Sequence, residues 1–148
     1  MRALPSERRN EKECDVTRKP ILCIDFDGVL HGYESGWKGA HRADDPPVAG
    51  AMEFLHEATK HFTVAVYSSR SKSPRGRWCM QAYARKHFNT ALTFSPDHSW
   101  DFLYEELRWP WFKPSAFFTI DDRAMTFEGT WPSIQTIKDF KPWNKRTK

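Results

Sequence analysis

The chain has 148 residues and a formal net charge of +4, and aromatic residues make up 15% of it. That length corresponds to a single domain, and the aromatic content is too high for a disordered chain. The sequence has no apolar run near the roughly 18 residues of a membrane span, no signal peptide at its charged start, and no C-x-x-C pair among Cys14, Cys23 and Cys79. We therefore expect a soluble, cytoplasmic protein that does not contact membranes.

The two ends of the chain differ from the sequence between them. Residues 1–19 are polar and basic and lack periodicity, which predicts a solvated arm, and residues 143–148 form a basic tail. Basic segments of this kind could also contact nucleic acid through its phosphates, and charge alone does not decide between the two interpretations. The predicted domain spans residues 20–142.

Strand-like and helix-like patterns alternate within this domain. Apolar runs predict strands over residues 21–24, 62–67, 91–94, 116–120 and 134–137. Apolar stripes at helical spacing predict helices that start near Asp45, Ser73 and Ser95, each followed by proline, and run to about residues 62, 87 and 107. This alternation is typical of a mostly parallel sheet with helical crossovers. We expect an α/β fold, a three-layer α/β/α sandwich with about five strands.

Polar residues stand at or near the ends of three predicted strands. Ligands of open α/β sheets bind at the carboxyl ends of the strands, so these side chains should converge. Carboxylates so close together repel one another unless a cation lies between them, and Mg²⁺ prefers oxygen ligands. The residues are Asp25, Asp27, Ser68, Ser69, Arg70, Lys113, Asp121, Asp122 and Arg123.

The segment Asp25-Phe26-Asp27-Gly28 carries the most specific signal. Residues two apart on an extended segment project to the same side, so both carboxylates could reach one centre. Two such acids permit a division of labour between a nucleophile and a proton donor, and Gly28 lets the chain turn away. A calcium loop is the alternative, but it needs a third ligand before the glycine and a distant glutamate. Gly28 instead follows Asp27 directly, which disfavours that alternative.

The remaining residues have ordinary structural interpretations when each is taken alone. Ser68 and Ser69 could lie in a turn, Lys113 could be a surface lysine, and the Asp121-Asp122 pair could cap a helix. Their order along the chain favours a shared site. A phosphorelay receiver domain also uses acids, a hydroxyl and a lysine, but its nucleophile follows the third strand and its lysine comes last. The order found here disfavours a receiver.

The ordered set resembles motifs I to IV of the haloacid dehalogenase superfamily, over roughly residues 20–140. The resemblance implies a Rossmann-like hydrolase domain and a phosphatase in which Asp25 is the nucleophile and Asp27 the general acid and base. It implies Mg²⁺ held by Asp25, the backbone carbonyl of Asp27 and Asp122, with Asp121 close by. Ser68 and Lys113 would complete the catalytic set. The resemblance assigns substrate binding to Ser68, Ser69, Arg70, Lys113 and Arg123.

Neither of the first two motifs is followed by an insertion large enough for a cap domain, so the resemblance implies an open site with a minimal cap or none. Open sites in this superfamily act on large substrates or are covered by a partner subunit, which would make the protein an oligomer. The Ser68-Ser69-Arg70 and Asp121-Asp122-Arg123 runs are also similar to the phosphatase module of polynucleotide kinase/phosphatases and to deoxynucleotidases.

We therefore expect a Mg²⁺-dependent phosphomonoester hydrolase that acts on a nucleotide or a nucleic-acid end. Tyr33 and Trp37, in the loop after the first motif, could stack on a base, although Trp37 could equally pack onto the domain edge. Two alternatives stay open. One is a phosphatase for small metabolites such as sugar phosphates, and the other is a catalytically idle binding module.

Overall fold

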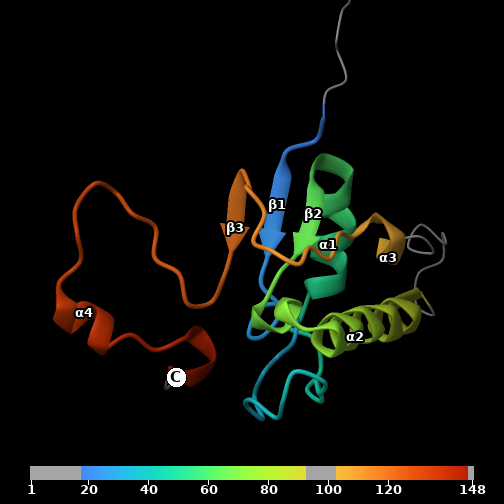
Figure 1. Ribbon diagram of the computed structural model, residues 1–148, viewed down its shortest axis with the longest axis horizontal. Helices are drawn as coiled ribbons and strands as arrows, with labels where there is room; N and C mark the ends of the chain where they lie inside the picture. Colours follow the sequence, from blue (N-terminus) through green and yellow to red (C-terminus); the bar gives the residue numbers. More distant parts are fainter. Residues whose placement is uncertain (1–17, 93–102, 147–148) are drawn as a thin grey trace, which may run out of the picture.

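The computed structural model describes residues 18–92 and 103–146, and it is built on a three-stranded, all-parallel sheet in the order β2-β1-β3. The predicted α/β class with a parallel sheet is confirmed. The strands are β1 (Ile21–Ile24), β2 (Thr63–Val66) and β3 (Phe118–Ile120). The helices are α1 (Ala51–His61), α2 (Pro74–Leu92), α3 (Leu103–Glu106) and α4 (Ile134–Lys138), with the 3₁₀ helices η1 (Ser69–Lys72) and η2 (Trp143–Lys145) (Figure 1).

The strand register aligns the carboxyl ends of all three strands. Ile24, the last residue of β1, pairs with Val66 of β2 and with Ile120 of β3. The next residue, Asp25, donates its backbone N–H to the carbonyl of Ile120 at 2.9 Å. Because the sheet is parallel, residues that follow the three strands emerge at the same edge.

The hydrophobic core covers one face of this sheet. Alternate residues of β1 and β2 point to that face, and α1 and α2 supply the side chains opposite them. From β2 the chain runs through α2 to Arg108, whose backbone bridges to Ala65 beyond the outer edge of β2. The crossovers through α1 and α2 therefore progress in the same direction, and right-handed connections place both helices on the same face. The cluster includes Leu22, Ile24, Met52, Leu55, Ala58, Val64, Val66, Met80, Tyr83, Ala84 and Phe88.

The other face of the sheet is crossed by an extended segment, residues 109–117. This segment returns from Arg108, outside β2, to β3 on the far side of β1, and Phe117 donates its N–H to the carbonyl of Ile21 at 2.9 Å. Figure 1 shows it passing in front of β2 and β1, with α1 behind them. Lys113 lies on this crossing segment and so approaches the carboxyl edge of the sheet from the face opposite α1.

The first predicted helix begins later than expected, at Ala51 rather than near Asp45. Pro46 accepts a hydrogen bond from the N–H of Gly32, and Val48 donates to the carbonyl of Leu30. These backbone groups pair with the loop after β1, so they are not available to a helix. The proline pair therefore marks a loop, and the helix starts only after it.

Two predicted strands are helical instead. Ala91 and Leu92, expected to open a strand over 91–94, are the last residues of α2, and Thr93 and Phe94 lie outside the described residues. Residues 134–137, the expected fifth strand, belong to α4. The Ser133 hydroxyl accepts a hydrogen bond from the N–H of Thr136 at 3.1 Å, which caps a helix and overrides the β-branched composition.

The predicted end segments are described only in part. Residues 1–17 and 147–148, and the predicted start of the third helix, lie outside the described residues. Lys19 donates from Nζ to the carbonyl of Thr59 at 2.7 Å, and Trp143 of the predicted tail opens η2. None of the described helices combines the length and the apolar character needed to cross a membrane.

Candidate active site

Three carboxylates meet at the carboxyl edge of the sheet. Asp25 follows β1, and Asp121 and Asp122 follow β3. Each contributes one oxygen, and the three oxygens lie within 4.8 Å of one another. The sequence prediction that these acids converge agrees with this arrangement, since the register of β1 and β3 brings their ends together.

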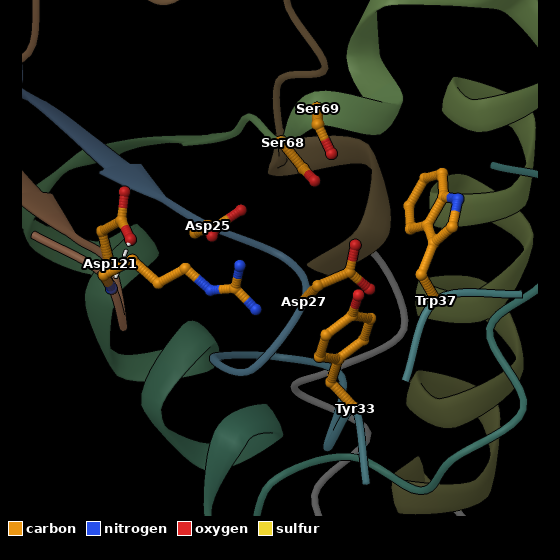
Figure 2. Close-up of a pocket in the computed structure, with 8 residues that line it drawn as sticks. Asp25, Asp27, Tyr33, Trp37, Ser68, Ser69 and Asp121 are labelled. Atoms are coloured by element: carbon orange, nitrogen blue, oxygen red, sulfur yellow. Dashed lines mark hydrogen bonds between the residues drawn. The ribbon is translucent and has the colours of Figure 1, made fainter. Parts of the chain in front are cut away.

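Asp25 and Asp121 line a cavity of about 250 Å³, together with Asp27. Figure 2 shows the hydroxyls of Ser68 and Ser69 on one side of it, Tyr33 on another, and Trp37 at the side away from Asp121. The cavity is therefore bounded by carboxylates, hydroxyls and two aromatic rings. The lining residues are Asp25, Asp27, Tyr33, Trp37, Ser68, Ser69, Asp121 and Arg123.

Asp25 occupies an environment that disfavours its charge. Burial raises its pKa to about 7, and the neighbouring carboxylates of Asp121 and Asp122 act in the same direction. The N–H of Phe26, which donates to Oδ1 of Asp25 at 2.7 Å, opposes this shift. An added positive charge would relieve the repulsion among the three acids and favour the ionised form of Asp25.

Asp122 supplies the observation that tests whether a cation fits. Its side chain is only 2% exposed, burial raises its pKa, and neither carboxylate oxygen has a hydrogen-bond partner from another of the described residues. The nearest cationic atom is Nε of Arg123, at 3.8 Å from Oδ2. A buried carboxylate that lacks donors is costly unless it binds an ion. The oxygens of Asp25, Asp121 and Asp122 are the hard ligands that Mg²⁺ prefers, so the residues fit this ion.

Asp27 lies in a different environment. Burial acts to raise its pKa, but hydrogen bonds from His31 and Arg70 outweigh burial and leave the pKa below its ordinary value. Arg70 donates from Nε to Oδ2 at 2.8 Å and from Nη2 to Oδ1 at 3.0 Å, and Nδ1 of His31 lies 2.9 Å from Oδ1. The pKa of Asp25 is thus raised and the pKa of Asp27 is lowered.

Arg70, predicted to bind substrate, lies behind the site. It is 1% exposed, and besides Asp27 its guanidinium contacts the carbonyls of Gly39, Ala40 and Arg42 at 2.7 to 3.0 Å. All of these partners are protein groups, so the geometry favours an orienting role for Arg70 over direct contact with substrate.

The other predicted side chains are distributed around the cavity. Ser68 is buried at the start of η1, where its N–H bonds to the Ser71 hydroxyl, while Ser69 is exposed. Lys113 lies in an adjoining cavity that shares Asp25, Ser68, Ser69 and Asp121 with the first. Arg123 is 60% exposed, and its guanidinium lies 5.9 Å from the ring centre of Tyr33.

His31, which the sequence analysis did not single out, also contacts the site. It is 1% exposed and in contact with Asp27. The signal available in the sequence was its position, four residues after Asp27 in a glycine-rich loop, but a histidine there is equally common as a packing residue. Its role depends on a fold-back of the loop that places Asp45 against it, at a separation of 14 residues.

Comparison with protein-family models, with curated proteins and with solved structures finds no match for this chain. The function must therefore be argued from the site.

Proposed function

We propose that this protein is a Mg²⁺-dependent phosphomonoester hydrolase that acts through an aspartyl-phosphate intermediate. The observation that carries the proposal is the cluster of Asp25, Asp121 and Asp122, in which the buried carboxylate of Asp122 receives no hydrogen bond from another of the described residues. Beside it lie a second first-motif acid, Asp27, and the hydroxyl of Ser68. This is the arrangement that a phosphoryl group needs if it is transferred to a carboxylate and then to water.

Mg²⁺ would be held by Asp25, Asp122 and the backbone carbonyl of Asp27, with Asp121 beside it, and would offset the charge of carboxylates and phosphate. A carboxylate oxygen of Asp25 attacks phosphorus, and the bond to the leaving oxygen breaks. Asp27 takes a proton from the water that hydrolyses the phosphoryl-aspartate and returns that proton to the leaving oxygen of the next substrate. Its low pKa favours the base role in the free site. Ser68 donates to a phosphoryl oxygen, and Lys113 adds positive charge from the opposite face.

The finer part of the proposal concerns the substrate and the fold. Tyr33 and Trp37 line the same cavity as Asp25 and Asp121, and aromatic faces beside a phosphate site can stack on a nucleobase. We therefore favour a nucleotide or a nucleic-acid end over a sugar phosphate. A cytoplasmic protein with a capless domain over residues 20–142 belongs to the same proposal. The expected three-layer sandwich does not, because α1 and α2 cover one face of the sheet and the extended segment 109–117 crosses the other.

Hydrolysis of p-nitrophenyl phosphate tests the proposal. We expect turnover with Mg²⁺, none after exhaustive treatment with EDTA, and recovery when Mg²⁺ is restored. Asp25→Asn should lower kcat by at least a thousandfold, because the amide cannot form the acyl phosphate. Asp139→Asn, in an exposed carboxylate next to α4, is the matched control and should retain full activity.

A panel of phosphorylated substrates then separates the alternatives. Faster turnover of mononucleotides or phosphorylated oligonucleotides supports the nucleotide assignment, and faster turnover of sugar phosphates supports the metabolite phosphatase. Absence of hydrolysis of every substrate with Mg²⁺ present would reject the enzyme and favour a binding module.

A further inference from the structure

His31 connects the catalytic motif to the loop that follows it. The ring is 1% exposed and stacks on Phe26, with centroids 5.5 Å apart and an angle of 15° between the planes. Tyr83 meets the ring edge-on at 5.4 Å and donates its hydroxyl to the carbonyl of Asp45 at 2.9 Å. The imidazole therefore has one position, fixed by packing on two sides.

Hydrogen bonds on both ring nitrogens determine which nitrogen carries the hydrogen. The backbone N–H of Asp45 points at Nε2 of His31 at 3.1 Å, and an amide can only donate, so Nε2 must be the acceptor. The hydrogen of the neutral ring is then on Nδ1, which lies 2.9 Å from Oδ1 of Asp27. His31 is a donor to the catalytic carboxylate.

The Nδ1–H donor of His31 determines which oxygen of Asp27 can accept a further hydrogen bond. Each carboxylate oxygen of Asp27 accepts about two hydrogen bonds. Oδ1 receives two, from Nδ1 of His31 and Nη2 of Arg70, and Oδ2 receives one, from Nε of Arg70. The remaining acceptor position of Asp27 is on Oδ2. His31 thus selects the oxygen that is left for substrate or water.

From this geometry we infer that His31 is a positioning residue, which orients Asp27 through an Nδ1–H donor so that Oδ2 faces the reaction. The inference rests on the proposed function, since it concerns the orientation of the acid in that reaction. It also gives the loop 31–45 a part in the proposed reaction. The loop is attached to Asp27 twice, through the Asp45 amide to His31 and through three carbonyls to Arg70.

Two substitutions test the two ring nitrogens of His31 one at a time. His31→Asn keeps a donor near the position of Nδ1 and loses the acceptor for Asp45. His31→Gln keeps an acceptor near the position of Nε2 and loses the donor to Asp27. We expect His31→Gln to lower kcat roughly ten- to a hundredfold with KM within twofold, and His31→Asn to stay within about threefold of the wild type. His61→Gln, at an exposed histidine of α1, is the control.

The loss in His31→Gln should also depend on the leaving group. A misplaced Asp27 impairs release of an alkoxide, such as a nucleoside or sugar hydroxyl, more than release of p-nitrophenolate, which needs little protonation. A partly unfolded population would lower kcat on both substrates by the same factor. Equal losses on both substrates, or equal losses in the Asn and Gln variants, would overturn the inference.

A spectroscopic measurement tests the donor without any substrate. Long-range ¹H–¹⁵N correlation of the wild-type protein should show His31 with hydrogen on Nδ1 and a bare Nε2. Hydrogen on Nε2 would overturn the inference even if the enzyme is an active phosphatase. Conversely, absence of phosphatase activity in the wild type with the predicted tautomer present would reject the proposed function and leave the hydrogen-bond geometry intact.

Discussion

Gly28 meets two separate requirements at the site. Its φ of 83° lies in the left-handed region, and a Cβ at this position would come within 2.5 Å of Oδ2 of Asp122. The missing side chain therefore allows the buried carboxylate to approach the first motif. Only glycine combines this backbone conformation with that close approach.

Gly28→Ala should accordingly lose Mg²⁺ binding as well as stability. We expect at least a tenfold weaker Mg²⁺ affinity by calorimetry, because Asp122 must move, and about 1–2 kcal/mol less stability from the left-handed backbone. Gly129→Ala is the matched control: its φ is 88°, and nothing lies within 4 Å of a Cβ there. It should lose similar stability and no Mg²⁺ affinity. Unchanged Mg²⁺ binding in Gly28→Ala would contradict the role given to Asp122.

The raised pKa of Asp25 predicts how stability depends on pH in the metal-free protein. Its folded-state pKa of about 7 lies above the ordinary value of 3.8, so the folded state holds the proton more tightly. This contribution is fully present below pH 4 and is lost as the pH rises through 7. Urea unfolding in EDTA should show the loss between pH 4 and 8. Asp25→Asn should reduce this loss without abolishing it, because burial also raises the pKa of Asp122. Stabilisation by Mg²⁺ should be larger at pH 8 than at pH 6.

At the scale of elements, the strands that carry the first, second and fourth motifs were predictable from sequence, because buried parallel strands are unbroken apolar runs. The site acids followed from these strands, since chain order and parallel pairing fix where strand ends meet. The run at 91–94 failed because the buried positions Met80, Ala84 and Phe88 keep a spacing of four residues that carries α2 to Leu92. At the outer edge of β2, Ala65 pairs with Arg108 in an isolated parallel bridge instead.

The contacts of the loop 31–45 were not predictable, because they depend on side chains distant in sequence. Arg70 lies 28 to 43 residues from its hydrogen-bond partners, and a basic residue after a strand gives no sign that it will be buried. Local patterns locate the acids, whereas the partners that orient them appear only once the chain is folded.

Arg70→Met tests how this loop is held. The variant removes the guanidinium from Asp27 and from three loop carbonyls, leaving His31 as the remaining donor to Asp27 described above. Loss of one partner of a buried ion pair costs about 3–5 kcal/mol. We expect that loss of stability, together with proteolytic cleavage within residues 33–44 under conditions that leave the wild type intact. Arg75→Met, at an exposed arginine of α2, should change stability by less than about 0.5 kcal/mol. Equal stability and equal proteolysis of the two variants would contradict the role given to Arg70 in holding the loop.

At the scale of the whole molecule, the segment after β3 leads away from the sheet to α4 and ends near the first motif (Figure 1). Nε1 of Trp143 donates to the carbonyl of Gly28 at 2.7 Å, across 115 residues of sequence. The C-terminal segment is thereby tied to the turn that carries the site.

Trp143→Phe should remove this tie while preserving an aromatic side chain. We expect a loss of about 0.5–1.5 kcal/mol in urea unfolding, the usual contribution of one hydrogen bond. The indole N–H of Trp143 should also exchange with solvent more slowly than that of Trp131, whose side chain is 84% exposed. Trp131→Phe is the control and should leave stability unchanged. A Trp143→Phe protein as stable as the control would show that the contact does not hold the segment.

Under the proposed function Asp25 receives the phosphoryl group, and a trapping experiment identifies the residue that carries it. Asp27→Asn protein, which lacks the base for the second step, is mixed with Mg²⁺ and p-nitrophenyl phosphate, quenched in acid, and mapped by peptide mass spectrometry. The account predicts one phosphoryl group, on Asp25, and none in the Asp25→Asn, Asp27→Asn double variant. A phosphoryl group on Ser68 or on a histidine would contradict it.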